Sequence, residues 1–209
     1  MNNTVKKFPI PLPVISLIAM VIGVWAYLQI DKEPVIQTPV IQTQAITLLQ
    51  SPRVLPEFQM VDKQGEPAGK EAFYGKWSLV FMGFTSCGHV CPTKMAEMRM
   101  IQDQLQDKFN APLSVAFVSV DPGRDTPAVI KQYVESFDPG FSGMTGSAET
   151  IEALANALGA PYFVDPDPEL YIVDHSSALF LIGPDASLVG FITPPLDINI
   201  IVDDLRQLF

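Results

Sequence analysis

Residues 78–92 read SLVFMGFTSCGHVCP. The apolar run 78–84 is typical of a buried central strand. After the cysteines, apolar residues recur at helical spacing from Pro92 to Phe109, and Pro92 stands where a first helical turn tolerates proline. A strand is therefore predicted to lead through a cysteine loop into a helix. Because the N–H groups and dipole of a helix N-terminus favour thiolates, we expect the sulfurs of Cys87 and Cys91 to ionise readily.

Strands and helices alternate along the rest of the chain. Further strands are predicted at 113–120, 177–182 and 188–192, and further helices at 126–137, 147–158 and 198–209. This order indicates an α/β fold with a central mixed sheet and helices on both of its faces. The thioredoxin-like fold is the compact version of that order, and a cysteine motif at the end of its first central strand would carry its chemistry.

The overall composition excludes several classes of protein. The chain has 209 residues, with 13 Lys and Arg against 23 Asp and Glu, and a formal net charge of −10. This acidic balance offers no electrostatic footprint for nucleic acid, so no nucleic-acid partner is expected. A hydrophobic content of 48% is enough to fill a core and excludes wholesale disorder. One domain with an appendage fits this length.

The N-terminal residues are predicted to be a membrane anchor. Residues 8–30 carry no charged side chain, and residues 14–30 form the longest apolar stretch without proline. A cleaved signal peptide is the alternative, but no small-x-small cleavage site follows the apolar stretch. Lys6 and Lys7 precede it, so the positive-inside rule places residues 1–13 in the cytoplasm. We expect a single-pass protein of the bacterial inner membrane, with its soluble domain on the periplasmic side.

A linker is predicted between the anchor and the domain. The sequence PVIQT occurs twice in succession at 34–43, and regularly spaced proline without glycine favours an extended stalk. We assign residues 31–50 to this linker and residues 51–209 to the soluble domain. About 20 extended residues would reach at most roughly 60 Å, which would hold the domain near membrane-bound partners.

The cysteine spacing favours a metal site without excluding a disulfide. Cβ atoms four residues apart on a helical turn are about 5–6 Å apart, wider than the roughly 3.5–4.5 Å of a disulfide. Cys87 and Cys91 with one imidazole would form a three-coordinate set suited to Cu(I). Either His175 or His89 could supply that imidazole, although on a helical turn His89 would point away from the cysteines. A structural or a redox disulfide remains open.

Other residues near these motifs have more than one interpretation. Asp174 could accept a hydrogen bond from the second ring nitrogen of His175, or it could be a turn residue. Asp121 and Arg124 follow a predicted strand, and an ion pair that braces the loop is favoured over a binding role. The methionines near the cysteines lie mostly on the apolar helix stripe and are expected in the core (Met95, Met98).

Five short segments stand in a distinctive order: GKW at 75–77, FTSC at 84–87, CPT at 91–93, VDPGRDTP at 120–127 and YIVDHS at 171–176. With them the chain resembles the Sco/SenC family of copper chaperones from about Pro56 to its C-terminus. The resemblance implies a thioredoxin-like fold in which Cys87, Cys91 and His175 bind one copper ion. The chain departs from the family at Gly88-His89-Val90, where an acidic residue is usual.

The resemblance also implies a function. Family members help to assemble the binuclear copper site of cytochrome c oxidase subunit II, by delivering copper or by reducing the cysteines of that site. The alternative is a thiol-disulfide oxidoreductase of the cell envelope that uses Cys87 and Cys91, and a thiol peroxidase is a third possibility.

Overall fold

The computed structural model describes residues 20–25, 42–109, 113–165, 167 and 171–209. The chain divides into two units, 1–40 and 41–209. Within the expected anchor at 14–30, residues 20–25 are helical, and the other residues lie outside the described part of the chain, as do linker residues 31–41. No helix among the described residues has both the length and the apolar character needed to cross a membrane.

The second unit is built on one eight-stranded mixed sheet. Its strand order is β1-β10-β9-β4-β5-β6-β2-β3, with β4, β5 and β6 parallel and the other neighbours antiparallel. The strands are β1 (Ile46–Val54), β2 (Met60–Asp62), β3 (Pro67–Ala68), β4 (Trp77–Gly83), β5 (Leu113–Ser119), β6 (Ser142–Thr145), β9 (Leu179–Ile182) and β10 (Ser187–Ile192). The predicted α/β fold with a mixed sheet is therefore confirmed.

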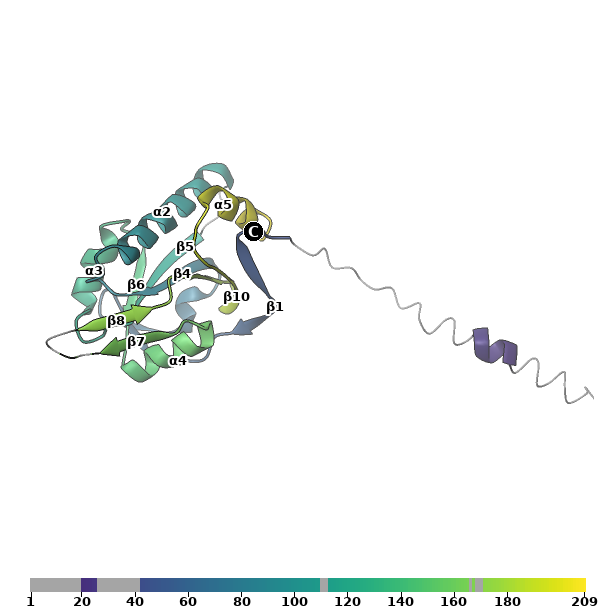
Figure 1. Cartoon of the computed structure of the whole chain (residues 1–209), viewed down its shortest axis with the longest axis horizontal. Helices are drawn as coiled ribbons and strands as arrows, with labels where there is room; N and C mark the ends of the chain where they lie inside the picture. Colours follow the sequence, from purple (N-terminus) through teal and green to yellow (C-terminus); the bar gives the residue numbers. More distant parts are fainter. Residues whose placement is uncertain (1–19, 26–41, 110–112, 166, 168–170) are drawn as a thin grey trace, which may run out of the picture. The chain divides into compact units, whose positions relative to one another are not determined.

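Helices cover both faces of this sheet, as Figure 1 shows. Side chains alternate along β4, so that Leu79 and Phe81 pack on one face and Val80 and Met82 on the other. The first face is covered by α2 (Val90–Phe109), α3 (Pro127–Glu135) and α5 (Ile198–Arg206), and the second by α4 (Ala148–Leu158). A short 3-10 helix, η1 (Lys70–Phe73), precedes β4. Both faces of β4 are buried, which explains its unbroken apolar run.

Helices α3 and α4 begin at the predicted capping residues, whereas α2 begins earlier than predicted. The hydroxyls of Thr126 and Ser147 accept hydrogen bonds from the first turns of α3 and α4, as expected. Helix α2 begins at Val90, two residues before the predicted start at Pro92. Cys91 therefore lies inside the first turn, where its side chain is held against the sheet.

Strand β1 begins within the segment assigned to the linker at 31–50. The buried carboxylate of Asp204 in α5 accepts hydrogen bonds from the backbone N–H groups of Gln44, Ala45 and Ile46. From Ile46 onward, the strand pairs with β10. The folded unit thus includes residues that precede the expected domain start at residue 51.

A separate two-stranded sheet lies beside the main one. It consists of β7 (Tyr162–Asp165) and β8 (Ile172–His175), and neither strand was predicted. His175 is the last residue of β8 and pairs with Tyr162, whereas the sequence placed it in a loop before a strand. Figure 1 shows this hairpin beside α4.

Candidate metal centre

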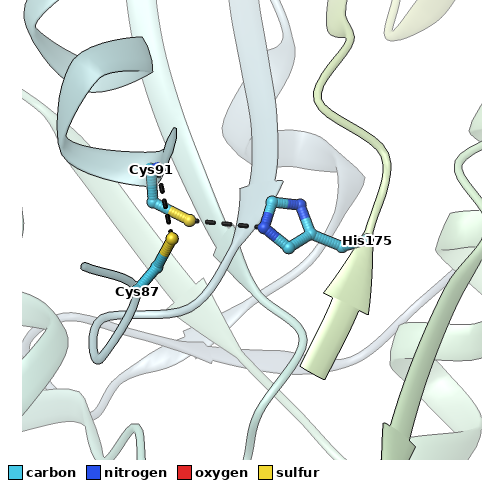
Figure 2. A group of neighbouring side chains, drawn as sticks. All are labelled: Cys87, Cys91 and His175. Atoms are coloured by element: carbon cyan, nitrogen blue, oxygen red, sulfur yellow. Dashed lines mark hydrogen bonds between the residues drawn. The ribbon is translucent and has the colours of Figure 1, made fainter. Parts of the chain in front are cut away.

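Two sulfur atoms and one imidazole nitrogen converge at the start of α2. The ligand atoms of Cys87, Cys91 and His175 all lie within 4.8 Å of one another, and Figure 2 shows the three side chains facing a common point. The Sγ atom of Cys91 is 3.3 Å from Nε2 of His175. The backbone N–H of Cys91 donates a hydrogen bond of 3.4 Å to Sγ of Cys87. Residues separated by 84 positions are thus brought into one cluster.

Glycine at the end of β4 makes room for the buried sulfur. A Cβ atom at Gly83 would lie 3.0 Å from Sγ of Cys91 and 2.8 Å from a ring carbon of Phe81. Both distances are too short for ordinary packing, so a side chain at this position would push the sulfur or the ring away. Gly83 therefore belongs to the construction of the site, although the sequence alone gave it no role.

The two thiols have different electrostatic environments. Burial raises the pKa of Cys91 to about 12, and this outweighs a backbone hydrogen bond from Phe84. Burial also opposes ionisation of the half-buried Cys87, but hydrogen bonds from Cys91 and from the backbone of His89 and Val90 lower its pKa below 9.0. The expectation that both sulfurs ionise readily is therefore wrong for Cys91, because desolvation there exceeds the helix effect.

The ring of His175 presents Nε2 to the cysteines. Its Nδ1 atom lies 2.9 Å from the carbonyl oxygen of Ser176. A carbonyl oxygen only accepts hydrogen bonds, so in the neutral ring Nδ1 carries the proton and Nε2 keeps its lone pair. The sequence offered this orienting role to Asp174, but Ser176 fills it. Asp174 precedes His175 on a strand and is exposed.

Aromatic rings enclose the imidazole. Phe81 and Phe84 both contact the His175 ring edge-on, with centroids 5.6 and 5.7 Å away. Phe84 also links to the cysteine loop, because its carbonyl oxygen accepts the N–H of Cys87. Phe84 ends the apolar run 78–84 and begins the FTSC segment, and nothing in the local pattern indicates that its ring will meet His175.

The other residues that the sequence singled out do not belong to this three-residue cluster. His89 is exposed and is not part of the three-residue cluster, although it lies between the two cysteines. Met95 and Met98 are fully buried in the core, as predicted, whereas Met100 is 52% exposed. Arg124 donates from Nε to Asp121, which confirms the expected ion pair in the loop after β5.

The donor set fits a single copper ion. Two thiol sulfurs and an imidazole nitrogen are soft or borderline ligands, a combination that selects Cu(I). A structural zinc site normally has four protein ligands, and the described residues bring together three here. Both cysteines are free thiols in the structure, so the same pair could also exchange electrons by forming a disulfide.

Comparisons with known proteins agree with this geometry. A family model described as SCO1/SenC matches residues 47–209. A protein of Stutzerimonas stutzeri is 38% identical over 155 residues, which cover 74% of this chain and 76% of the relative.

Two solved structures share the fold. The copper-bound structure of Arabidopsis thaliana ScoI has a TM-score of 0.68 at 28% identity, and the match covers 74% of this chain and 99% of that one. Apo Sco1 from Thermus thermophilus has a TM-score of 0.69 at 31% identity, and the match covers 82% and 99%. These matches confirm the thioredoxin-like fold that the sequence predicts.

Proposed function

This chain belongs to the SCO1/SenC family, and from that premise we propose that it binds one copper ion through Cys87, Cys91 and His175. We propose further that it serves the binuclear copper site of cytochrome c oxidase subunit II, by delivering copper or by maintaining the thiols of that site. The observation that carries the proposal is the convergence of two sulfurs and Nε2 within 4.8 Å.

The unequal burial of the three ligands supports a transfer role. Cys91 is fully buried, whereas Cys87 and His175 are partly accessible. A three-coordinate ion leaves room for an incoming thiolate, and ligand exchange would begin at the accessible Cys87. The lowered pKa of Cys87 favours the thiolate form of the departing sulfur, and Cys91 would then be the last ligand to leave.

Location at a membrane is part of the same proposal. Residues 14–30 would anchor the chain, and the PVIQT repeats would act as a stalk that places the domain on the periplasmic side. The proposal is supported by the charge-free stretch at 8–30 and by the lysines that precede it. The acceptor would be a membrane-bound oxidase subunit within reach of the stalk.

Copper titration tests the ligand assignment. Cu(I) is titrated into the reduced full chain in detergent, in competition with a chromophoric chelator. One equivalent should bind tightly to the unmodified chain, and Cys87→Ser, Cys91→Ser and His175→Ala should each weaken binding strongly. His89→Ala is the matched control, because His89 is exposed beside the same loop but lies outside the cluster. Stoichiometric binding that survives Cys87→Ser or His175→Ala would refute the assignment.

A thiol-disulfide oxidoreductase is the second candidate function. The observation that favours it is the pairing of an accessible thiol of lowered pKa with a buried thiol of raised pKa. Cys87 would attack an acceptor disulfide, Cys91 would then displace the acceptor thiolate, and the chain would end with a Cys87–Cys91 disulfide while the acceptor gains two electrons. Incubating the chain with a disulfide-bonded acceptor distinguishes the two functions. Reduction without copper supports the oxidoreductase, and metal transfer to an already reduced acceptor supports the chaperone.

A further inference from the structure

The hairpin that carries His175 does not pair with the main sheet in the part of the chain that the structure describes. Strands β7 and β8 pair with each other there, whereas both cysteines follow the central strand β4. A cavity of about 500 Å³ lies against the hairpin, lined in part by Gly123, Tyr162 and Tyr171. His175 lies four residues before β9 of the main sheet, and ladder hydrogen bonds between the two sheets do not set its distance from the cysteines, so side-chain contacts contribute to that distance.

One arginine links the hairpin to the cysteine loop. The guanidinium carbon of Arg124 lies 3.8 Å from the ring centroid of Tyr171, which directly precedes β8. The same carbon lies 5.8 Å from the ring centroid of Phe84, which precedes the cysteine loop. Arg124 thus contacts an aromatic ring on each of the two segments that bring ligand atoms to the cluster.

A buried carboxylate fixes the orientation of this arginine. Asp121 is fully buried, accepts from Nε of Arg124 and accepts a 2.7 Å hydrogen bond from the hydroxyl of Tyr171. Arg124 and Tyr171 are therefore attached to one carboxylate while they stack on each other. Phe84 completes the connection through its edge-on contact with the ring of His175.

We propose that Arg124 is a positioning residue that sets the separation between His175 and the sulfurs of Cys87 and Cys91, with Tyr171 as its partner on the hairpin. The inference rests on the proposed copper function. Only a planar cation can stack on an aromatic ring while its Nε donates to Asp121, and lysine keeps the charge but lacks the plane. If Arg124 only stabilised its own loop, the ion pair with Asp121 would be enough and the stacking on Tyr171 would not be needed.

The first test measures the metal-free chain. The chain has two histidines, so His89→Ala identifies the ring resonances of His175 by NMR. Arg124→Lys and Tyr171→Phe should each shift and broaden those resonances. Arg99→Lys is the matched control, because Arg99 has a similar exposure of 37% and also pairs with carboxylates, away from the cluster. Unchanged His175 resonances in Arg124→Lys would overturn the proposal.

The second test separates positioning from general stability. Arg124→Lys should weaken Cu(I) binding by roughly 10- to 100-fold, the loss typical when a group that orients a ligand is removed. In a His175→Ala background the same change should have no further effect, because there is no imidazole left to position. Equal losses in both backgrounds would overturn the proposal in favour of a structural brace. A chain that binds no copper would refute the proposed function and leave the NMR result to decide the positioning role.

Discussion

At the residue level, Cys87 and Cys91 differ in exposure and in acidity. Cys87 is half-buried with a lowered pKa, and Cys91 is fully buried with its pKa raised to about 12. We expect iodoacetamide to alkylate Cys87 first in the reduced, metal-free chain, with a rate that reaches half of its maximum below pH 9.0, because the pKa of Cys87 is lowered. Cys91 should react only as the pH rises toward its raised pKa or as the chain unfolds.

Mass spectrometry of quenched samples measures the order of modification. The folded chain holds the proton of the Cys91 thiol more tightly than the unfolded chain does. The contribution of Cys91 to stability is therefore complete below pH 9.0 and is lost as the pH rises toward 12. Urea unfolding between pH 8 and 11 should show this loss, and it should be absent in Cys91→Ala. Alkylation of Cys91 before Cys87 would contradict the assignment.

Tyr133 places its hydroxyl group in a buried position. Its oxygen is buried and has no hydrogen-bond partner among the residues that the structure describes, while its ring packs on Phe117 and Phe137. Burial, together with the nearby thiols, raises its pKa. We expect Tyr133→Phe to leave the free energy of unfolding unchanged or to increase it by about 1 kcal/mol, because it removes an unsatisfied polar group. Phe137→Ala, which removes packing instead, should destabilise the chain in the same urea titration.

At the level of elements, β1 depends on a side chain from α5. Asp204 is 1% exposed and accepts hydrogen bonds from three successive backbone N–H groups at the start of the strand. Asp204→Ala would leave those donors without partners, and we expect a loss of roughly 2–4 kcal/mol in the free energy of unfolding. Hydrogen exchange at Ile46 should accelerate, since β1 is an edge strand. Asp203→Ala is the control, because Asp203 is exposed and should change stability by less than about 0.5 kcal/mol.

The elements that the sequence predicts share long apolar runs or clear caps. Strands β4 and β5 have seven residues buried almost throughout, and α3 and α4 begin at the Thr126 and Ser147 caps. The missed strands β2, β3 and β6 have two to four residues, too few to show a periodicity. Strand β1 is mostly exposed and contains a proline, so its sequence ITLLQSPRV does not stand out as a strand.

Part of the candidate site was also predictable from the sequence. The cysteine spacing indicated a metal, and the resemblance to the family singled out His175. The burial of Cys91 was not predictable, because it depends on where α2 starts and on the space that Gly83 leaves. The roles of Ser176 and Tyr171 depend on the position of a hairpin that no local pattern revealed.

At the level of the whole molecule, the site lies where three separate segments meet. Parallel strands β4 and β5 end at the same edge of the sheet. The loop after β4 carries Cys87, and the loop after β5 carries Arg124. The β7–β8 hairpin brings His175 to the same edge. Loops at the carboxyl ends of parallel strands are the usual place for binding sites in open α/β sheets. Copper bound there would connect the hairpin to the main sheet, so we expect binding to stabilise the whole unit.

We expect copper binding to raise both the free energy of unfolding and the Tm. A ligand present at 100 times its dissociation constant adds about 2.7 kcal/mol to the stability of a protein that binds it only when folded. For a domain of this size, that corresponds to a rise in Tm of roughly 5–10 °C. Differential scanning calorimetry of the reduced full chain with and without Cu(I) measures it, and a Cu(I) chelator should reverse it. His175→Ala should reduce the rise and His89→Ala should preserve it. An equal rise in Cys87→Ser would mean that the stabilising copper binds elsewhere on the chain.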